Sequence, residues 1–208
     1  MRTGVLSFQG DFARHESTLL HAGVNVVGVR TPEQLANIDA LIIPGGESTT
    51  IGMLCERFGL LREIVDRIDH GMPVFGTCAG AILLAEHIEE SDQPRIGGLE
   101  MRIRRNAYGR QRESFERNVS LSAEFATEMA VATGESETDS FSGVFIRAPR
   151  ITDVSDEVEV LARDGDDPVL VRKGHIWAST FHPELTGDSR IHRTFLARAK
   201  SMFVTSVD

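Results

Sequence analysis

A lone cysteine lies at the apex of a predicted strand, turn and helix. The residues 73–77 are nearly all apolar, Cys78 follows them inside the glycine-flanked segment 76–80, and an apolar run continues over 81–85. At such a turn the amides and dipole of the following helix favour a thiolate, and small neighbours leave room for a substrate carbonyl. Cys78 is therefore a candidate nucleophile. The alternative is a small core residue at an ordinary strand-to-helix turn.

The candidate partner of this cysteine is a histidine near the end of the chain. A β-rich run ends at His182, because Pro183 has no amide proton to donate to a sheet. Glu184 can return to the same side and accept a hydrogen bond from the imidazole, as the third member of a catalytic triad does. For any one of the seven histidines, the alternative interpretation is a position in a surface loop without a catalytic role. The order Cys, His, Glu nevertheless predicts nucleophilic catalysis by a thiol.

A third segment combines an apolar strand with two adjacent glycines. Residues 40–43 run into Pro44, Gly45 and Gly46, and the Ser/Thr cluster that follows is expected to cap a helix beginning near Thr49. Adjacent glycines let the backbone approach a ligand closely and aim amides at a developing oxyanion. An ordinary turn before a helix is the alternative.

These segments carry a family resemblance. Residues 44–48 (PGGES), 76–80 (GTCAG) and 181–184 (FHPE) resemble, in this order, the three signature segments of the class I, or triad, glutamine amidotransferases. More narrowly, the chain resembles the glutaminase-subunit family of the pyridoxal 5'-phosphate synthases. The segments that point to this subgroup are residues 4–10 (GVLSFQG), 105–111 (RNAYGRQ) and 143–149 (GVFIRAP). The similarity extends over nearly the whole chain.

The resemblance implies an enzyme that hydrolyses L-glutamine to glutamate and ammonia through a glutamyl thioester. It assigns catalysis to Cys78, His182 and Glu184. It assigns an oxyanion hole to the amides of Gly46 and Ala79. Glutamine binding falls, by the same resemblance, to Gly46, Glu47, Ser48, Arg105, Ile146 and Arg147. Neither a cofactor nor a metal is implied.

The same resemblance implies a protein partner. Ammonia would pass through an internal channel to a synthase subunit, on which the glutaminase docks and without which it is poorly active. Gln9 and Gly10 follow the first predicted strand and are expected on the same rim as the site, where they would take part in partner contact or gating. The alternative is that they only cap the first strand. Rival interpretations are the glutaminase of another amidotransferase, such as the histidine-biosynthesis enzyme, a related Cys hydrolase or chaperone-like protein, and a non-catalytic scaffold subunit.

Composition agrees with such an enzyme. The 208 residues fit a single glutaminase domain over 1–208. The net charge of −9 argues against nucleic acid, which needs a basic stripe. No apolar run approaches the roughly 18 residues of a membrane span, and the first residues resemble a strand instead of a signal peptide. Two cysteines indicate a reducing, cytoplasmic location, and Cys55 is expected to be an inert core thiol.

The hydrophobic pattern predicts an α/β fold of the class I glutamine amidotransferase type, a flavodoxin-like three-layer sandwich. A mostly parallel central sheet would have helices on both faces and an antiparallel extension. An acidic, solvated loop is expected over residues 123–142. The predicted strands span 3–8, 25–30, 40–44, 73–77, 100–105, 117–121, 143–146, 157–163, 168–173 and 175–180, with a hairpin turn at Lys173 and Gly174. The predicted helices span 12–22, 50–58, 60–70, 79–88 and 189–203.

Overall fold

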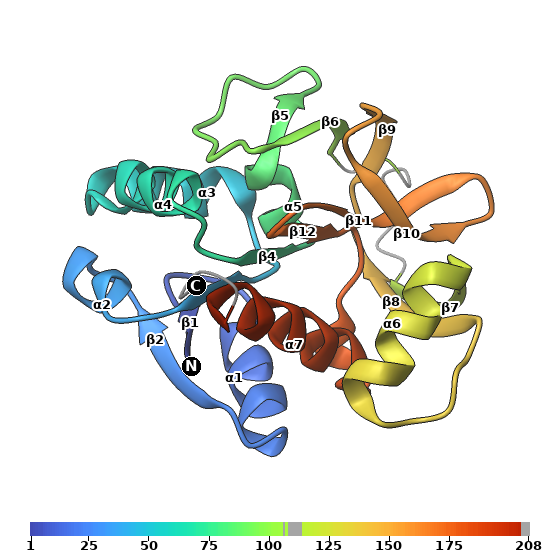
Figure 1. The fold of residues 1–208 in the computed structure, drawn as a ribbon. Coiled ribbons are helices and arrows are strands. Elements are labelled where there is room, and N and C mark those ends of the chain that lie inside the picture. Colours follow the sequence, from blue (N-terminus) through green and yellow to red (C-terminus); the bar gives the residue numbers. More distant parts are fainter. Residues whose placement is uncertain (106, 108–113, 205–208) are drawn as a thin grey trace.

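A nine-stranded mixed sheet forms the centre of the computed structural model, which describes residues 1–105, 107 and 114–204 (Figure 1). Five strands on one side run parallel and four strands continue the sheet with antiparallel pairing. In sheet order the strands are β2 (Asn25–Val29), β1 (Arg2–Leu6), β3 (Ala40–Ile43), β4 (Val74–Thr77), β12 (Ile176–Ser179), β11 (Asp167–Lys173), β10 (Glu159–Asp164), β7 (Ser114–Leu121) and β8 (Ser140–Ile146).

Helices cover both faces of this sheet, because its central strands are apolar on both sides. Along β3, Leu41 and Ile43 pack into one core cluster and Ile42 into the other. The first face is covered by α2 (Pro32–Ala36), α3 (Ser48–Arg57), α4 (Leu60–Asp69) and α5 (Ala79–Leu84), and the second by α1 (Phe12–His21), α6 (Ala123–Thr133) and α7 (Arg190–Val204) (Figure 1). The predicted three-layer α/β architecture is confirmed.

The second half of the chain forms the antiparallel extension and a small separate sheet. The predicted hairpin turn is present, since Lys173 pairs with Ile176 and Gly174 between them has φ +56°. The small sheet is made of β5 (Ala85–Ile88), β6 (Leu99–Arg104) and β9 (Arg150–Val154). The sequence patterns missed β9 and also the short helix α2.

The predicted helix over residues 79–88 is wrong in its second half. Helix α5 ends at Leu84, and Ala85 already has extended backbone angles, φ −73° and ψ 138°. The chain then pairs in parallel with β6. Every side chain of α5 is buried, whereas Glu86 and His87 are exposed, so the chain leaves the core at this point. Propensity alone did not reveal this change, because the tertiary pairing partner lies beyond the local sequence.

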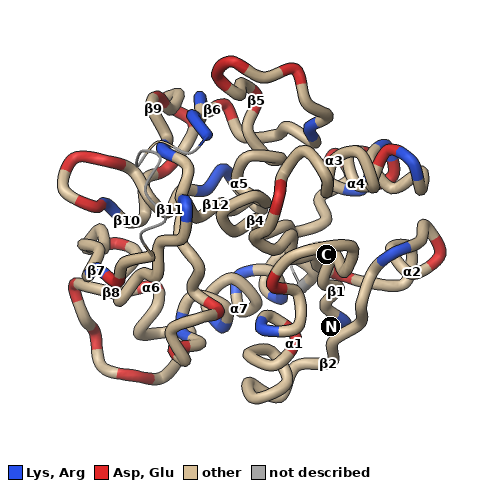
Figure 2. The backbone as a smooth tube through the Cα atoms, turned by 180° about the vertical axis from the view of Figure 1, so that it is seen from behind, with Lys and Arg blue, Asp and Glu red and all other residues tan. Residues whose placement is uncertain are grey.

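The predicted acidic loop over residues 123–142 is also wrong in large part. Residues 123–133 form α6, which Ser122 caps by accepting a hydrogen bond from the Phe125 amide, and which ends at the left-handed Gly134. Phe125 and Met129, one helical turn apart, bury the inner face of this helix. Acidic residues do gather in the exposed connection that follows α6, and a second group lies in the turn between β10 and β11 (Figure 2).

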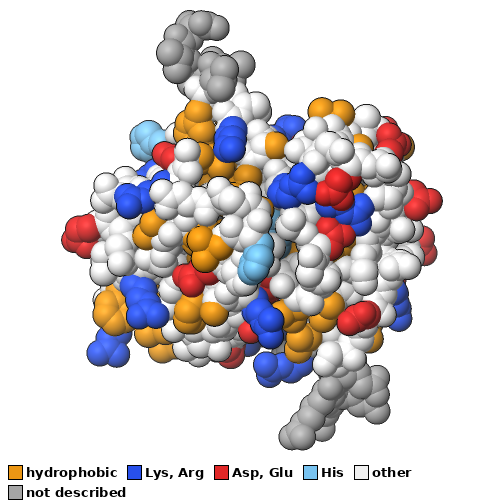
Figure 3. Space-filling model, turned by 90° about the horizontal axis from the view of Figure 1, so that it is seen from below, with side chains coloured by type: hydrophobic (Ala, Val, Ile, Leu, Met, Phe, Trp, Pro, Cys, Tyr) orange, Lys and Arg blue, Asp and Glu red, His pale blue; other side chains and the backbone are white. Residues whose placement is uncertain are grey.

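On the face seen in Figure 3, exposed apolar side chains lie in separate patches among charged ones. Within residues 1–105, 107 and 114–204, the structure contains no helix that is both long and apolar enough to cross a membrane.

Candidate functional site

Cys78 occupies a sharp turn between β4 and α5. Its backbone angles, φ 48° and ψ −99°, are uncommon for a residue with a side chain, and such strain is frequent at reactive positions. The turn is held on both sides, because the Cys78 amide donates to the Ser179 carbonyl at 2.8 Å and its carbonyl accepts from the Ile82 amide at 3.3 Å. The thiol therefore projects from the carboxyl end of a central strand, as predicted.

The glycines beside Cys78 allow this turn to pack tightly. A Cβ atom on Gly80 would lie 2.2 Å from the Ile43 carbonyl oxygen, and one on Gly76 would lie 2.5 Å from the backbone of Gly80. Any side chain at either position would push α5 away from β3 and β4. The two glycines are thus required by close approach of backbone to backbone.

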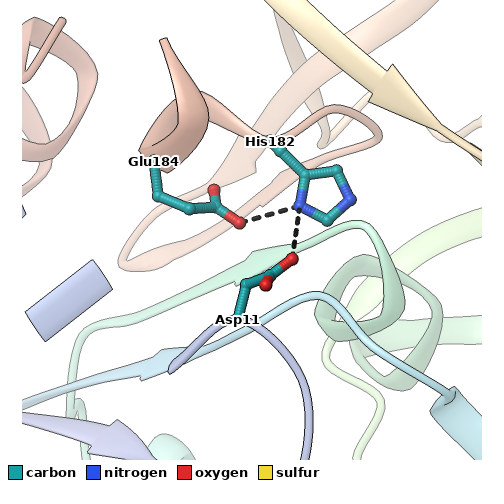
Figure 4. Close-up of side chains that lie close together, drawn as sticks. All are labelled: Asp11, His182 and Glu184. Atoms are coloured by element: carbon teal, nitrogen blue, oxygen red, sulfur yellow. Dashed lines mark hydrogen bonds and ion pairs between the residues drawn. The ribbon is translucent and has the colours of Figure 1, made fainter. Parts of the chain in front are cut away.

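His182 and Glu184 meet as expected. The Nδ1 atom of His182 lies 2.8 Å from Oε1 of Glu184, whose carboxylate has no exposed surface (Figure 4). Glu184 lies in the 3₁₀ turn Pro183–Leu185, and the His182 amide donates to the Val144 carbonyl of β8 at 2.8 Å. The imidazole is therefore fixed by its ring and by its backbone.

A second carboxylate faces the same ring nitrogen. Oδ2 of Asp11 lies 3.9 Å from Nδ1 of His182, so that both carboxylates approach this nitrogen from the same side of the ring (Figure 4). Asp11 comes directly after Gln9 and Gly10 and is the N-cap of α1, a position that the sequence patterns had not marked as part of the site. The only signal for it was its place behind the carboxyl end of a buried parallel strand.

The electrostatics of the pair favour a protonated imidazole. Burial by itself would lower the pKa of His182, but hydrogen bonds and charge from Cys78 and Glu184 outweigh it and raise the pKa to about 10. Burial would raise the pKa of Glu184, and interactions with His15 and His182 outweigh that effect and hold this pKa well below its usual range. His182 thus holds a proton close to the thiol, and Glu184 stays ionised.

Residues 45–47 form the neighbouring wall of the site, and the loop between β1 and α1 holds them in place. The Gly45 carbonyl accepts from the Asp11 amide at 3.2 Å, and the Glu47 amide donates to Oε1 of Gln9 at 2.8 Å. A Cβ on Gly45 would lie 2.3 Å from Cε1 of His182, so this glycine admits the imidazole. Gln9 is therefore a structural support of this loop.

The helix after this loop begins earlier than predicted. Helix α3 begins at Ser48, and the cap is Glu47, which accepts from the amides of Thr49 and Thr50. A carboxylate at this position also complements the positive end of the helix dipole. Burial would raise the pKa of Glu47, but the hydrogen bonds from Thr50 and Thr49 and the charge of Arg105 outweigh it and lower the pKa.

Arg105 reaches the same wall from the end of β6. Its guanidinium donates to Oε1 of Glu47 at 2.9 Å, to Oγ1 of Thr49 at 3.0 Å and to Oε1 of Gln93 at 2.8 Å. A guanidinium has five N–H donors, so three hydrogen bonds leave donors for a ligand. Of the signature segment 105–111, only Arg105 and Ala107 lie within the described residues.

These groups surround a cleft of about 310 Å³. All the residues predicted to bind substrate line it, together with Cys78 and His182, whereas Glu184 lies buried behind His182. Asp11 and Ile82 are lining residues that the sequence patterns missed. The lining consists of Asp11, Gly46, Glu47, Ser48, Cys78, Ile82, Arg105, Ile146, Arg147 and His182.

Asp11, His182 and Glu184 also offer one oxygen or nitrogen atom each within 4.8 Å of one another, a separation that a metal ion could bridge. Both carboxylates, however, approach the same ring nitrogen. With the pKa of His182 raised to about 10, the proton on this nitrogen already supplies the positive charge between them. The trio is thus accounted for by an imidazolium that is hydrogen-bonded to Glu184 and ion-paired with Asp11.

Comparison with known proteins extends these observations. A model of the SNO glutamine amidotransferase family matches residues 5–201. The chain is 48% identical over 198 residues to the pyridoxal 5'-phosphate synthase subunit PdxT of Carboxydothermus hydrogenoformans, covering 95% of this chain and 97% of that protein. It is also 48% identical to the protein of the same name from Thermus thermophilus, over 94% of this chain and 96% of that protein.

Solved structures give the same picture at the level of the fold. A crystal structure described as a glutamine amidotransferase superposes with a TM-score of 0.85 at 48% identity, covering 95% of this chain and 98% of that one. The structure of PurLQS from Thermotoga maritima superposes with a TM-score of 0.67 at 16% identity, over 100% of this chain and 99% of that one. The second likeness concerns the fold alone.

Proposed function

The chain belongs to the SNO glutamine amidotransferase family, and we propose that it hydrolyses L-glutamine to glutamate and ammonia as the glutaminase subunit of a pyridoxal 5'-phosphate synthase. The observation that carries the chemistry is the convergence of Cys78 and His182 in one cleft, with the ionised Glu184 behind the imidazole. This arrangement supports an activated thiol nucleophile with its acid–base partner.

In the first half of the reaction the Cys78 thiolate attacks the side-chain carboxamide carbon of glutamine. The carbonyl oxygen becomes an oxyanion, and we assign its hydrogen-bond donors to the amides of Ala79, the first residue of α5, and of Gly46, in the loop after β3. His182, protonated at rest because its pKa is raised to about 10, gives a proton to the departing nitrogen. The C–N bond breaks, and ammonia and a glutamyl thioester result.

In the second half His182, now neutral, takes a proton from water as that water attacks the thioester. The C–S bond breaks, glutamate leaves, and the proton that the imidazole has taken restores the starting pair with the thiolate. Glu184 keeps the ring in one orientation throughout, because its carboxylate accepts from Nδ1 at 2.8 Å.

The opposite wall of the cleft suits the amino-acid end of glutamine. Arg105 and Arg147 provide guanidinium groups for the α-carboxylate, and the remaining donors of Arg105 allow a two-point contact. The carboxylate of Glu47 and the backbone at Ile146 provide acceptors for the α-ammonium group. We therefore assign glutamine binding to Gly46, Glu47, Ser48, Arg105, Ile146 and Arg147.

Ammonia released into water at neutral pH is protonated and loses its nucleophilicity. We therefore propose that this chain docks on a synthase subunit and passes ammonia to it through an internal channel. The name of its relatives, pyridoxal 5'-phosphate synthase subunit, supports the docking. A single glutaminase domain over residues 1–208 and a cytoplasmic location stay predictions from the sequence.

The decisive experiment measures glutamate release from L-glutamine by the purified chain, alone and mixed with the synthase subunit of the same organism. We expect strong stimulation by this partner, with loss of about 10⁴-fold or more in kcat in Cys78→Ala. Cys55→Ala is the matched control, because it removes the other thiol without touching the cleft, and its activity should equal that of the wild type.

Three outcomes would contradict the proposal. Glutamate release that persists in Cys78→Ala would remove the thiol mechanism. Activity that depends on Cys78 but is not stimulated by the synthase subunit would support a glutaminase that serves another synthase. Inactivity with every partner would contradict the glutaminase function and favour the scaffold interpretation.

A further inference from the structure

A buried histidine that the mechanism does not use lies directly behind the triad. His15, on α1, has no exposed surface, although its side chain is polar. It lies beside Glu184, whose carboxylate is also fully buried and whose Oε2 has no hydrogen-bond partner among the described residues. A carboxylate removed from water in this way needs partners to remain ionised.

The ring of His15 joins two segments that carry the site. Its Nε2 atom lies 3.3 Å from Oε1 of Glu184 and 3.1 Å from Oγ1 of Thr77, the residue before Cys78. The ring thus bridges the end of β4, which leads into the cysteine turn, and the 3₁₀ turn that carries Glu184. Oε1 of Glu184 is shared between His15 on one side and Nδ1 of His182, at 2.8 Å, on the other.

A second buried histidine sets the direction of this contact. Nδ1 of His15 lies 3.0 Å from Nε2 of His192 on α7. If His192 donates from Nε2, then His15 accepts at Nδ1 and carries its own proton on Nε2, which faces Glu184 and Thr77. His192 Nδ1 is then a bare acceptor, and it has no partner in the described part of the chain. With these tautomers, every ring N–H group of His15 and His192 has an acceptor.

We propose that His15 is a positioning residue of the glutaminase reaction: it holds the Glu184 carboxylate ionised and in register with both His182 and the cysteine turn. The inference rests on the proposed function, since it concerns the same triad. Without the Nε2 contact of His15, Glu184 keeps only His182 among its described partners, and it becomes free to turn or to take up a proton. Either change weakens the charge that keeps His182 protonated.

Two variants of His15 separate positioning from packing. In His15→Gln, the side-chain amide nitrogen can occupy the place of Nε2 and still donate to Glu184. In His15→Asn, the shorter side chain keeps a polar group near His192 but does not reach Glu184. His21→Gln is the matched control, because His21 is an exposed histidine on the same helix that bonds only to Ser17 in the described structure.

The variants are tested in complex with the synthase subunit. We expect His15→Asn to lose about 10- to 100-fold in kcat with an unchanged KM, as orienting partners of catalytic groups do when removed. The alkaline limb of its kcat profile should move to lower pH, and its Cys78 should react more slowly with iodoacetamide at pH 7. His15→Gln should recover most of kcat and both pH properties, and His21→Gln should match the wild type.

The pH readout involves a small set of groups. Among the described residues, the titratable groups that act on this cluster are Cys78 and Asp11 facing His182, and Asp188 acting on His192. A folded His15→Asn variant with the kcat, alkaline limb and alkylation rate of the wild type would overturn the inference. So would equal losses in the Asn and Gln variants, which indicate packing alone.

The test also separates this inference from the function on which it rests. If the wild-type complex does not release glutamate in a Cys78-dependent way, the proposed function fails. The rate of iodoacetamide reaction at Cys78, which needs no glutamine, then still decides whether His15 acts on the cysteine–histidine pair. Should His15→Asn fail to fold, His15→Gln is compared with His15→Leu at a temperature where both are folded. The Gln variant is then expected to retain kcat and the pH properties, and the Leu variant to lose them.

Discussion

The surroundings of the two cysteines show how one side chain acquires opposite chemistry within one fold. Cys55 is completely buried and Cys78 is 7% exposed, so burial barely distinguishes them. Cys55 lies on a regular stretch of α3 among apolar side chains, where burial raises the pKa of its thiol to about 12. Cys78 lies on a strained turn beside His182 and at the start of a helix. Polar partners, and not exposure, decide which thiol can react.

The backbone explains why only one of the two thiols has such partners. In the middle of a helix the amides are engaged by carbonyls four residues back, so they offer no free N–H group to a thiolate or a ligand. At the first residues of a helix the amides lack such partners and are available to a ligand. The sharp turn at Cys78 also directs its side chain toward the carboxyl edge of the sheet, where β12 delivers His182.

A thiol reagent gives the most direct test of the difference in reactivity between Cys78 and Cys55. At pH 7.5 we expect iodoacetamide to modify the folded chain once, at Cys78, because that thiol has an imidazolium partner and opens to the cleft. Cys55 should react only after unfolding in urea. Peptide mass spectrometry locates the adduct, and Cys78→Ala should remain unmodified when folded. An adduct at Cys55 in the folded protein would show that burial does not protect it.

A smaller effect is expected from neutralising the carboxylate behind the imidazole. Glu184→Gln should lower kcat by about 10²- to 10⁴-fold, since the ring loses both its orienting acceptor and the charge that raises the His182 pKa to about 10. The alkaline limb of kcat should therefore move to lower pH, and Cys78 should behave more like an ordinary thiol toward iodoacetamide. A pH profile that does not move would show that Glu184 is not the source of the raised pKa.

The smallest expected effect is on stability and belongs to Cys55. Its pKa is raised from 9.0 to about 12 in the folded chain, so this thiol contributes stability that is complete below pH 9 and is lost as the pH rises toward 12. The slope is at most about 1.4 kcal/mol per pH unit. Urea unfolding between pH 8 and 10.5 should therefore show a steeper decline for the wild type than for Cys55→Ala. Parallel curves would contradict the raised pKa.

Much of the parallel half of the fold was predictable from local patterns. The apolar runs of β3 and β4 predict strands buried on both faces, and the amphipathic helices between them predict the crossover connections that parallel strands require. The second half was harder. The break between α5 and β5 and the helix α6 in an acidic region both depend on contacts with distant segments, which no local window contains.

The site divides in the same way. The residue types and order of Cys78, His182 and Glu184, with the glycines around them, predicted the chemistry, because a strained turn and a strand end leave recognisable residues in the chain. Asp11, Ile82 and His15 left no such mark. Each of them belongs to the site through its position in space alone, after β1, α5 and α1 have packed around the carboxyl edge of the sheet.

The sequence by itself therefore determined the identity of the reacting groups and the family to which they belong. Only the tertiary structure decided which proton sits where: the raised pKa of His182, the ionised Glu184 and the neutral surroundings of Cys55. The physical reason is that a pKa depends on burial and on charges within a few ångströms, and in this chain those charges come from segments far apart in the sequence.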